Sequence, residues 1–350
     1  MRVLLTGAAG FIGGTVLGVL RARHHDVVAV DALIPQAHPA NARAPAGIRR
    51  LDVRDAAALR RALDGVDVVC HQAAMVGAGV TPADLPLYAA HNDLGTAVLL
   101  AAMAEAGVSR LVLASSMVVY GDGRYACAKH GTQPATSRRL ADLAAGQFDV
   151  TCPVCSARME WELVDERAAL QPRSSYAASK VAQEHYASAW ARQLPGAVVA
   201  LRYHNVYGPG MPQDTPYSGV AALFRSALER GEAPRVFEDG GQTRDFVHVS
   251  DVATANALTV DMVLAEPADS FAAYNICSGQ PISIADVARQ VAAGAGRENV
   301  APVVTGEFRA GDVRHVVASP ELAREELGFT AQVRPEAGLA EFATAPLRQG

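Results

Sequence analysis

Residues 2–13, RVLLTGAAGFIG, decide the fold class of this chain. A short apolar run is followed by Gly7, Gly10 and Gly13, and then by a helical pattern that continues to Arg23. Glycines at these places allow a tight turn, let backbone N–H groups reach a pyrophosphate, and let the helix pack closely on the strand. The stretch therefore predicts a dinucleotide-binding loop between a first strand and a first helix.

Short apolar runs and helical patterns alternate beyond this loop. Buried strands are predicted at Arg2–Thr6, Asp26–Val30, Val66–Cys70, Arg110–Ala114 and Ala197–Leu201, and helices at Gly13–Arg23, Ala56–Leu63, Asn92–Ala106 and Ser175–Gln193. Strand–helix alternation implies right-handed crossovers and a parallel sheet that is covered on both faces. The predicted fold is a doubly wound α/β (Rossmann) sheet.

The alternation breaks in two places, which indicates further units. Residues 122–172 are polar and loop-like, and towards the C-terminus the predicted elements become shorter and mixed. The smaller C-terminal unit is expected over the carboxyl ends of the strands, where open α/β sheets keep their ligand crevice. We predict a cofactor-binding domain at 1–203, which an insertion at 122–160 interrupts. A substrate-binding domain is predicted at 204–350. Within it, residues 246–264 are a candidate segment for return to the first domain.

Composition and charge exclude several classes of protein. Half of the 350 residues are apolar and 19% are charged, so neither a disordered nor a fibrous chain is expected. The net charge of −5 offers no basic surface for a nucleic acid. Glycines interrupt every long apolar run, so no stretch of about 20 residues could span a membrane. Five cysteines are too few for a disulfide scaffold, and an odd number cannot all form pairs. A cytoplasmic protein is therefore expected.

Acidic residues after the second and third strands fit the same dinucleotide. Asp31 ends the second strand, 18 residues after Gly13. A carboxylate at this place accepts the ribose hydroxyls of NAD and repels the additional phosphate of NADP. Asp52 and Val53, after a third strand, are placed to hold the adenine. NAD is therefore the expected cofactor.

A tyrosine and a lysine open one of the predicted helices. Tyr176 and Lys180, in YAASK, lie one turn apart on one face, and the chain has only two lysines. A phenol is a poor base at neutral pH unless its phenolate is stabilised. A nearby ammonium and an oxidised nicotinamide would lower the pKa of the tyrosine. Ser116, just after Arg110–Ala114, is placed to hydrogen-bond the same reacting hydroxyl; a strand-end cap is its alternative role.

These residues belong to a series of motifs that runs along nearly the whole chain. The series comprises Gly7–Gly13, Asp31, His71–Ala74 (HQAA), Ser115–Gly121 (SSMVVYG), Tyr176–Lys180 (YAASK), Arg202–Pro209 (RYHNVYGP) and Arg244–His248 (RDFVH). Through them the chain resembles the extended short-chain dehydrogenases/reductases of the nucleotide-sugar epimerase/dehydratase family. The motifs stand in the order that this family has, which makes the resemblance specific.

The resemblance implies roles for the matching residues. It assigns the catalytic triad to Ser116, Tyr176 and Lys180. It implies NAD contacts at Gly7, Gly10, Phe11, Ile12, Gly13, Ala73, Ala74, Asn92, Tyr176, Lys180 and Tyr203. For the nucleotide-diphosphate sugar it points to Ser116 and Asn205, to Phe237 stacking on the base, and to Arg244 and Arg309 on the phosphates. It also implies a homodimer, in which the helices at 92–106 and 175–193 pair across a two-fold axis.

Departures from the family pattern narrow the activity. Dehydratases of the family carry an Asp–Glu pair after the catalytic hydroxyl, whereas Met117 and Val118 stand here and can do no acid–base chemistry. The expected reaction is therefore 4-epimerisation of a nucleotide sugar, with a dTDP-deoxyhexose favoured, through a transient 4-keto sugar. An NAD(P)H-dependent 4-ketoreductase needs the same triad and is the alternative, and a non-catalytic cofactor sensor is a more distant one. His204 replaces a more usual Phe and is expected to pack locally.

The insertion carries two pairs of metal-ligating residues. Cys127 and His130 form one pair, Cys152 and Cys155 form the other, and 21 residues separate the pairs. Four such ligands are typical of a closed tetrahedral structural zinc site; free loop thiols beside a surface histidine are the alternative. A cysteine-bearing insertion of this kind resembles that of a bacterial subgroup which includes dTDP-L-rhamnose 4-epimerases.

Overall fold

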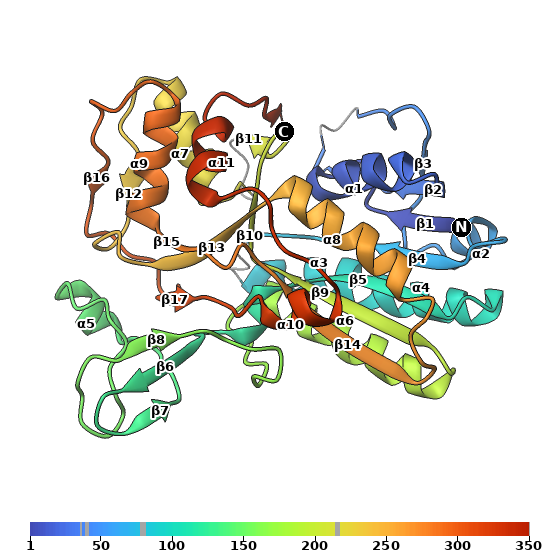
Figure 1. Ribbon diagram of the computed structural model, residues 1–350, viewed down its shortest axis with the longest axis horizontal. Helices are drawn as coiled ribbons and strands as arrows, with labels where there is room; N and C mark the ends of the chain where they lie inside the picture. The colour runs from blue at the N-terminus through green and yellow to red at the C-terminus, as the bar shows by residue number, and fades with distance from the viewer. Residues whose placement is uncertain (36, 39–41, 78–81, 214–217, 350) are drawn as a thin grey trace.

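Seven parallel strands form the central sheet of the computed structural model, which describes residues 1–35, 37–38, 42–77, 82–213 and 218–349 (Figure 1). The strands are β1 (Arg2–Thr6), β2 (Asp26–Asp31), β3 (Ile48–Arg50), β4 (Val68–His71), β5 (Arg110–Ser116), β9 (Ala197–Tyr203) and β14 (Ser270–Ile276). Their order is β14-β9-β5-β4-β1-β2-β3, and all pairings are parallel. The strand order reverses between β1 and β4, which opens a crevice at their carboxyl ends. The prediction of a doubly wound Rossmann sheet is confirmed.

Helices cover both faces of this sheet (Figure 1). One face carries α1 (Phe11–Ala22), α8 (Val249–Met262) and α10 (Glu321–Glu326), and the other carries α2 (Ala56–Ala62), α4 (Gly95–Ala106) and α6 (Ser175–Gln193). Successive side chains of a strand point to opposite faces. Val3 and Leu5 of β1 accordingly pack against the first group of helices and Leu4 against the second. Burial on both faces explains the near-continuous apolar runs of the sequence.

Two parts of the fold differ from the elements expected from the sequence. The helix expected at 92–106 begins only at Gly95, because η2 (Ala89–Leu94), a turn of π-helix, precedes it after η1 (Pro82–Asp84) and α3 (Leu85–Tyr88). The strand β14 joins the sheet edge by pairing with β9 along its whole length. Only its last three residues are fully buried, so its sequence lacks the apolar run that marks the inner strands.

A smaller unit continues from the carboxyl end of β9. Its sheet has the order β10 (Asn205–Tyr207), β13 (Thr243–His248) and β15 (Pro281–Ser283), and β17 (His315–Val316) also pairs with β13. Its helices are α7 (Val220–Glu229), α9 (Ile284–Gly294) and α11 (Pro335–Phe342), which enclose a separate apolar core with β13. Two short pairs, β11 (Pro212–Gln213) with β18 (Arg348–Gln349) and β12 (Arg235–Val236) with β16 (Val303–Val304), border this unit.

The insertion is more ordered than its polar sequence suggests. After η3 (Met117–Tyr120), it forms an antiparallel sheet of β7 (Gly131–Gln133), β6 (Arg124–Cys127) and β8 (Glu160–Glu162), with α5 (Leu140–Ala144) beside it (Figure 1). Its core is small and consists of Tyr125, Cys127, Val150, Cys152 and Met159. None of the helices in the described part of the chain is long and apolar enough to cross a membrane.

Candidate active site

The turn from β1 to α1 leaves no room for a side chain at its first and last glycines. Gly7 has a φ of +68°, and a Cβ added there would lie 2.7 Å from the backbone nitrogen of Ala73. A Cβ on Gly13 would lie 2.0 Å from the carbonyl oxygen of Gly7. Only glycine fits at both positions. Gly10, the N-cap of α1, closes the turn, so that backbone N–H groups at the helix N-terminus can meet an anion.

A pocket of about 100 Å³ lies beside this turn, at the carboxyl ends of β1, β2 and β4. The Asp31 carboxylate on its wall accepts hydrogen bonds from the N–H groups of Ala9 (2.9 Å) and Leu33 (2.8 Å), which fix its position. Hydrogen bonds from Arg54 hold the pKa of the Asp52 carboxyl below its usual value. Of the residues expected at the cofactor, this pocket gathers Gly7, Gly10, Asp31, Asp52, Val53, Ala73 and Ala74.

Two basic side chains that the sequence analysis missed stand close to Asp31. His38 Nε2 lies 3.6 Å from Oδ1 of Asp31, and Arg348 donates hydrogen bonds to the carbonyl oxygens of Ala9 (2.8 Å) and Ala37 (3.4 Å). Burial lowers the pKa of both basic groups, and the charge of Asp31 opposes that shift. Arg348 comes from the far end of the chain, so no local spacing could have indicated it.

Asn92, which was expected to contact the cofactor, makes three hydrogen bonds within the protein. Its side chain is completely buried. Its amide accepts a hydrogen bond from the N–H of Met75 (2.7 Å) and donates to the carbonyl of Met75 (2.9 Å) and to the Ser179 hydroxyl (2.8 Å). Asn92 therefore ties the segment after β4 to α6, and its contact with the cofactor stays a prediction.

Tyr203 also points into the protein. Its hydroxyl lies within hydrogen-bonding distance of Oε1 of Gln72 (3.0 Å) and Oδ1 of Asn256 (2.9 Å), which joins the ends of β9 and β4 to α8. Phe11 and Ile12, which were expected at the cofactor as part of the glycine loop, pack against the two apolar cores on either side of α1. None of these three side chains lines the pocket beside the glycine turn, and their contacts with the cofactor stay predictions.

The expected catalytic side chains meet at the carboxyl end of β5. Ser116 ends β5, and Tyr176 and Lys180 lie in the first turns of α6, whose N-terminus is capped by the Ser174 side chain. Lys180 Nζ is 5.9 Å from the centre of the Tyr176 ring and donates a hydrogen bond to the carbonyl of Ala114 at 2.9 Å. The fold thus places Ser116 close to Tyr176 and Lys180, which the sequence linked to each other only by their helical spacing.

Burial decides the protonation of this group. It raises the pKa of Tyr176 to about 12, and hydrogen bonding to the Ser116 side chain offsets only part of the increase. It also lowers the pKa of Lys180 to about 8, against the attraction of the Glu184 carboxylate. A phenol with such a pKa is protonated at pH 7 and needs a further positive charge nearby before it can act as a base.

A buried ion pair that no local pattern indicated supports the catalytic end of α6. Arg202 of β9 donates to both carboxylate oxygens of Glu184, from Nε at 3.0 Å and from Nη2 at 2.8 Å, and both side chains are almost fully buried. Ser115 of β5 donates to the same carboxylate at 2.5 Å, and Arg202 also donates to the Tyr120 hydroxyl at 2.9 Å. The pair fixes α6 to the two strands that end beside Tyr176.

A larger pocket, of about 500 Å³, is lined by all four side chains expected to hold the nucleotide, namely Asn205, Phe237, Arg244 and Arg309. The guanidinium of Arg309 stacks over the Phe237 ring, 5.1 Å from its centre. Arg244 donates hydrogen bonds to the carbonyl oxygens of residues 313 (2.6 Å) and 314 (2.9 Å), so part of its guanidinium holds the pocket wall. An aromatic ring and guanidinium groups are suited to an aromatic base and a diphosphate.

Several polar atoms at or beside this pocket have no hydrogen-bond partner among the described residues. They are both ring nitrogens of His204, Oδ1 of Asn205 and Oε1 of Gln242. His204 is 4% exposed, and burial lowers its pKa to about 3, so the ring is neutral at pH 7. Local packing was expected of His204, but its ring nitrogens are left without partners. Buried polar atoms of this kind are costly unless water or a bound molecule meets them.

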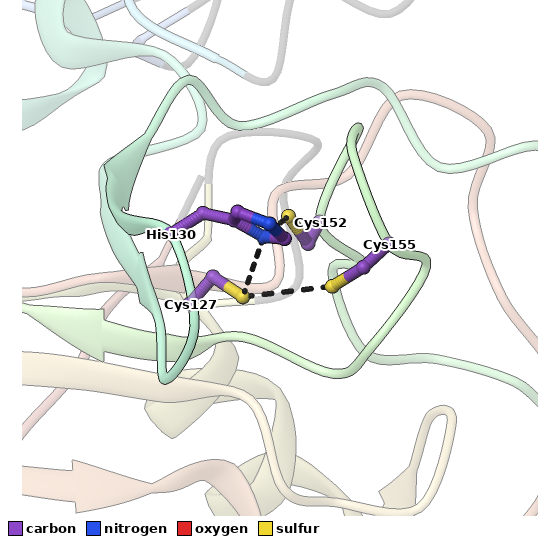
Figure 2. A group of neighbouring side chains, drawn as sticks. All are labelled: Cys127, His130, Cys152 and Cys155. Carbon is purple, nitrogen blue, oxygen red and sulfur yellow. Dashed lines mark hydrogen bonds between the residues drawn. The ribbon is translucent and has the colours of Figure 1, made fainter.

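Cys127, His130, Cys152 and Cys155 form a cluster whose ligand atoms all lie within 4.8 Å of one another (Figure 2). His130 Nδ1 is 3.6 Å from Sγ of Cys127 and 3.5 Å from Sγ of Cys152, and the Sγ atoms of Cys127 and Cys155 are 3.7 Å apart. Around a tetrahedral zinc, Zn–S and Zn–N bonds of ordinary length place two sulfurs about 3.8 Å apart and a sulfur and a nitrogen about 3.6 Å apart. The three distances given match these values, so the cluster fits zinc, with Nδ1 as the ligand atom of His130.

A glycine-rich turn at the switch point of a parallel sheet is typical of one class of protein, the dinucleotide-binding enzymes. A sequence profile of the NAD dependent epimerase/dehydratase family matches residues 3–140 and 156–277. The chain belongs to this family, and the resemblance drawn from its motifs is confirmed. The profile leaves out residues 141–155, the part of the insertion that carries Cys152 and Cys155.

Similar proteins cover nearly the whole chain. A dTDP-L-rhamnose 4-epimerase of Burkholderia thailandensis is 36% identical over 98% of this chain and 94% of its own length. A UDP-glucose 4-epimerase of Mycolicibacterium smegmatis is 30% identical over 97% of both chains. The solved structure of a Thermus thermophilus UDP-glucose 4-epimerase in complex with NAD is 31% identical, covers 98% of both chains, and has a TM-score of 0.75. These findings confirm the predicted class of enzyme, an epimerase, and support NAD as its cofactor.

Proposed function

We propose that the chain is an NAD-dependent 4-epimerase of a nucleotide-diphosphate sugar. The observation that supports the proposal is that Ser116, Tyr176 and Lys180 lie together. They lie at the carboxyl ends of the strands, where the glycine loop also lies. Met117 and Val118, which follow Ser116 in η3, offer no group that could eliminate water from a sugar. Relatives named as 4-epimerases support the same reaction.

Each catalytic side chain has a role that its position supports. Bound NAD supplies the chemistry of accepting a hydride from carbon 4 of the sugar and returning it to the other face. Tyr176 takes the proton of the hydroxyl on carbon 4 and later gives it back. Lys180 stabilises the phenolate, since the pKa of Tyr176 must fall from about 12 before this step. Ser116 orients the sugar oxygen.

We assign the sugar nucleotide to the larger pocket. Phe237 would stack on the base, Arg244 and Arg309 would meet the phosphates, and Asn205 would contact the same nucleotide diphosphate. The similarity to a dTDP-L-rhamnose 4-epimerase favours a dTDP-deoxyhexose as the substrate. The alternative is a 4-ketoreductase that takes a dTDP-4-keto-6-deoxyhexose, because that reaction needs the same three side chains.

An assay of the purified protein separates the two reactions. It is incubated with dTDP-L-rhamnose and, separately, with UDP-glucose, with catalytic NAD, and the products are separated by chromatography. We expect the 4-epimer of one of these sugars, with no net absorbance change at the reduced-nicotinamide band. Oxidation of NADH or NADPH in proportion to a 4-keto sugar, without epimerisation of either 4-hydroxy sugar, would assign the chain to the reductases.

We also propose that the cluster of Cys127, His130, Cys152 and Cys155 binds one structural zinc. Four protein ligands leave no open position for a substrate, so the metal would stabilise the insertion and take no part in the chemistry. Elemental analysis of protein purified without added metal is expected to give about one zinc per chain. Cys152→Ser should lose the metal, whereas Cys277→Ala, in the buried core of the Rossmann unit, should keep it. Metal-free protein with a protease-resistant insertion would contradict the proposal.

A homodimer is the third proposal. The outer face of α6 carries exposed Ala178, His185, Tyr186 and Ala189, and Leu94 of η2 is 54% exposed. The two alanines leave room for a second helix to approach closely, and the exposed tyrosine and leucine offer it surface to cover across a two-fold axis. We expect a dimer by light scattering at micromolar concentration, and Ala189→Glu should shift it towards a monomer. A wild-type monomer would contradict the proposal.

A further inference from the structure

The insertion contacts the larger pocket through buried, charged side chains. Glu238, directly after Phe237, is 2% exposed. Its Oε1 is 2.8 Å from Nη1 of Arg138 in the insertion, and its Oε2 is 2.9 Å from Nη1 of Arg314. Both arginine side chains are at least nine-tenths buried. One carboxylate thus joins a residue of the insertion to the two segments that form the pocket wall.

Further bonds from the insertion hold the same wall. Arg138 also donates to the carbonyl oxygen of Asp312 at 2.6 Å, and Asp312 lines the pocket. Asp149 of the insertion accepts hydrogen bonds from Arg314 at 3.0 and 3.1 Å. The Tyr125 hydroxyl accepts a hydrogen bond from the N–H of His315 at 3.0 Å. The segment from 312 to 315 therefore receives bonds from three separate places in the insertion.

Two of these three places lie close to residues of the cysteine cluster. Tyr125 shares the strand β6 and a five-residue core with Cys127, and Asp149 lies three residues before Cys152. A core of this size is too small to fold stably by burial alone, so a metal at the cluster would supply most of the ordering free energy. Four-ligand geometry keeps that metal away from the substrate, and its influence must pass through the protein.

We propose that the metal-held insertion positions the nucleotide-binding pocket, so that loss of the metal or of the Arg138–Glu238 contact weakens binding of the nucleotide but leaves NAD binding intact. The proposal rests on the proposed function, because it takes the larger pocket to hold the nucleotide diphosphate. Arg314 connects the two: its backbone carbonyl accepts from Arg244, and its side chain binds the insertion. Arg309, which stacks on Phe237, lies on the same segment three residues before Asp312.

The insertion does not line the cofactor pocket. The residues that line this pocket come from β1, β2, η2 and the loops that follow β1, β2, β3 and β4, and none of them belongs to the insertion. A general loss of folding would weaken both kinds of binding. A positioning role weakens nucleotide binding alone, and this difference makes it testable.

The test uses the full-length protein and two variants of adjacent arginines. Arg138→Met removes the contact with Glu238 and keeps the apolar stem of the side chain. Arg139→Met is the matched control, because Arg139, the N-cap of α5, is 80% exposed and pairs among the described residues with Asp142 of that helix. Titration calorimetry with dTDP and with UDP should give a Kd about tenfold higher for Arg138→Met than for the wild type. The Kd for NAD should stay within about twofold, and Arg139→Met should change neither value.

Metal removal and hydrogen exchange complete the experiment. Chelator-treated protein should show the same selective weakening, restored by added zinc, and removal of metal should weaken nucleotide binding less in Arg138→Met than in the wild type, because the Arg138 contact is already lost. Amide exchange over residues 309–316 should speed up in both cases. Unchanged nucleotide affinity and exchange in zinc-loaded Arg138→Met, or equal nucleotide binding with and without metal, would overturn the proposal. If wild-type protein binds neither dTDP nor UDP, the proposed function fails instead, and the exchange rates still decide whether the insertion orders this segment.

Discussion

At the scale of single residues, the protonation of Tyr176 is the point on which the proposed chemistry depends. The side chains expected from the YAASK motif and from Ser116 lie together, but burial raises the pKa of Tyr176 to about 12. Lys180, whose own pKa burial lowers to about 8, is the nearby cation that the protein contributes. The phenol is therefore held in its acid form until a second positive charge arrives, which restricts proton transfer to the enzyme with oxidised cofactor bound.

Tyr176→Phe tests this residue directly. The substitution removes the proton acceptor at the sugar oxygen and keeps the ring that packs beside Tyr88. We predict a fall in kcat of at least about a hundredfold, the usual scale of general acid–base catalysis, with the Kd for NAD changed by less than about threefold. Steady-state kinetics and cofactor titration measure the two quantities. A turnover within a few-fold of the wild type would rule out Tyr176 as the acid–base group.

Asp31 should decide the choice between NAD and NADP. Its carboxylate faces the cofactor pocket, where it would repel the additional phosphate of NADP, and both His38 and Arg348 stand beside it. In Asp31→Asn the repulsion is lost and the basic groups remain, so we predict that the preference for NAD over NADP falls at least about tenfold. Asp26→Asn, at the exposed start of the same strand, is the control. An unchanged ratio of the two dissociation constants would show that discrimination lies elsewhere.

At the scale of elements, α6 is the helix that carries both Tyr176 and Lys180, and its bounds match the prediction from sequence. Local signals sufficed there, because Ser174 caps the helix and the pattern continues without a break to Gln193. The ion pair that holds the helix in place could not be predicted, since Glu184 and Arg202 lie on different elements. The strand β14 was missed for a related reason: an edge strand that is only partly buried lacks a marked apolar pattern.

Glu184→Gln tests the anchoring of α6. The substitution leaves the Arg202 guanidinium buried and without its counter-charge, which costs about 3–5 kcal/mol when one partner of a buried pair is removed. We predict a loss of this size in the free energy of unfolding, measured by urea titration. Glu105→Gln breaks the exposed pair with Arg60 on neighbouring helices and should cost less than about 1 kcal/mol. Equal losses in the two variants would contradict a structural role for the buried pair.

At the scale of the whole molecule, the sequence predicted the sheet and much of the cofactor pocket but not the contacts between distant segments. Strand–helix alternation is a local pattern that the sequence shows directly. It places the glycine loop and Asp31 at the ends of the first two strands, beside the switch point where the strand order reverses. Arg348 beside the glycine loop and Glu238 beside the insertion are brought to their places by tertiary folding alone. The cysteine spacing predicted that the four Cys and His side chains of the insertion would lie together, whereas the bonds between the insertion and the larger pocket became visible only in three dimensions.

The buried neutral histidines predict how stability changes with pH. Burial lowers the pKa of both His71 and His204 to about 3, well below the value near 6.5 that they regain on unfolding. Between these values the unfolded chain binds more protons than the folded one, so stability must fall as the pH falls from about 6.5 towards 3. Each histidine contributes a slope of up to about 1.4 kcal/mol per pH unit.

Unfolding of the wild type and of His204→Phe at pH values from about 6 to 5 measures this contribution. In the wild type, His204 takes up a proton on unfolding in this pH range. The variant lacks this uptake, so we predict that its stability depends less steeply on pH. The comparison cancels other acid-sensitive groups, including the cysteine cluster. The same slope in both proteins would mean that His204 is protonated in the folded state.

The most direct test of the proposed function follows the hydrogen on carbon 4. A nucleotide sugar carrying deuterium at carbon 4, either dTDP-L-rhamnose or UDP-glucose, is converted in ordinary water with catalytic NAD and an excess of unlabelled NADH in solution, and the product is analysed by mass spectrometry and NMR. For a 4-epimerase that keeps its cofactor bound, we predict a 4-epimer that retains the deuterium at carbon 4. Replacement of that deuterium by hydrogen from NADH or from water, or the absence of any 4-epimer, would contradict the proposal.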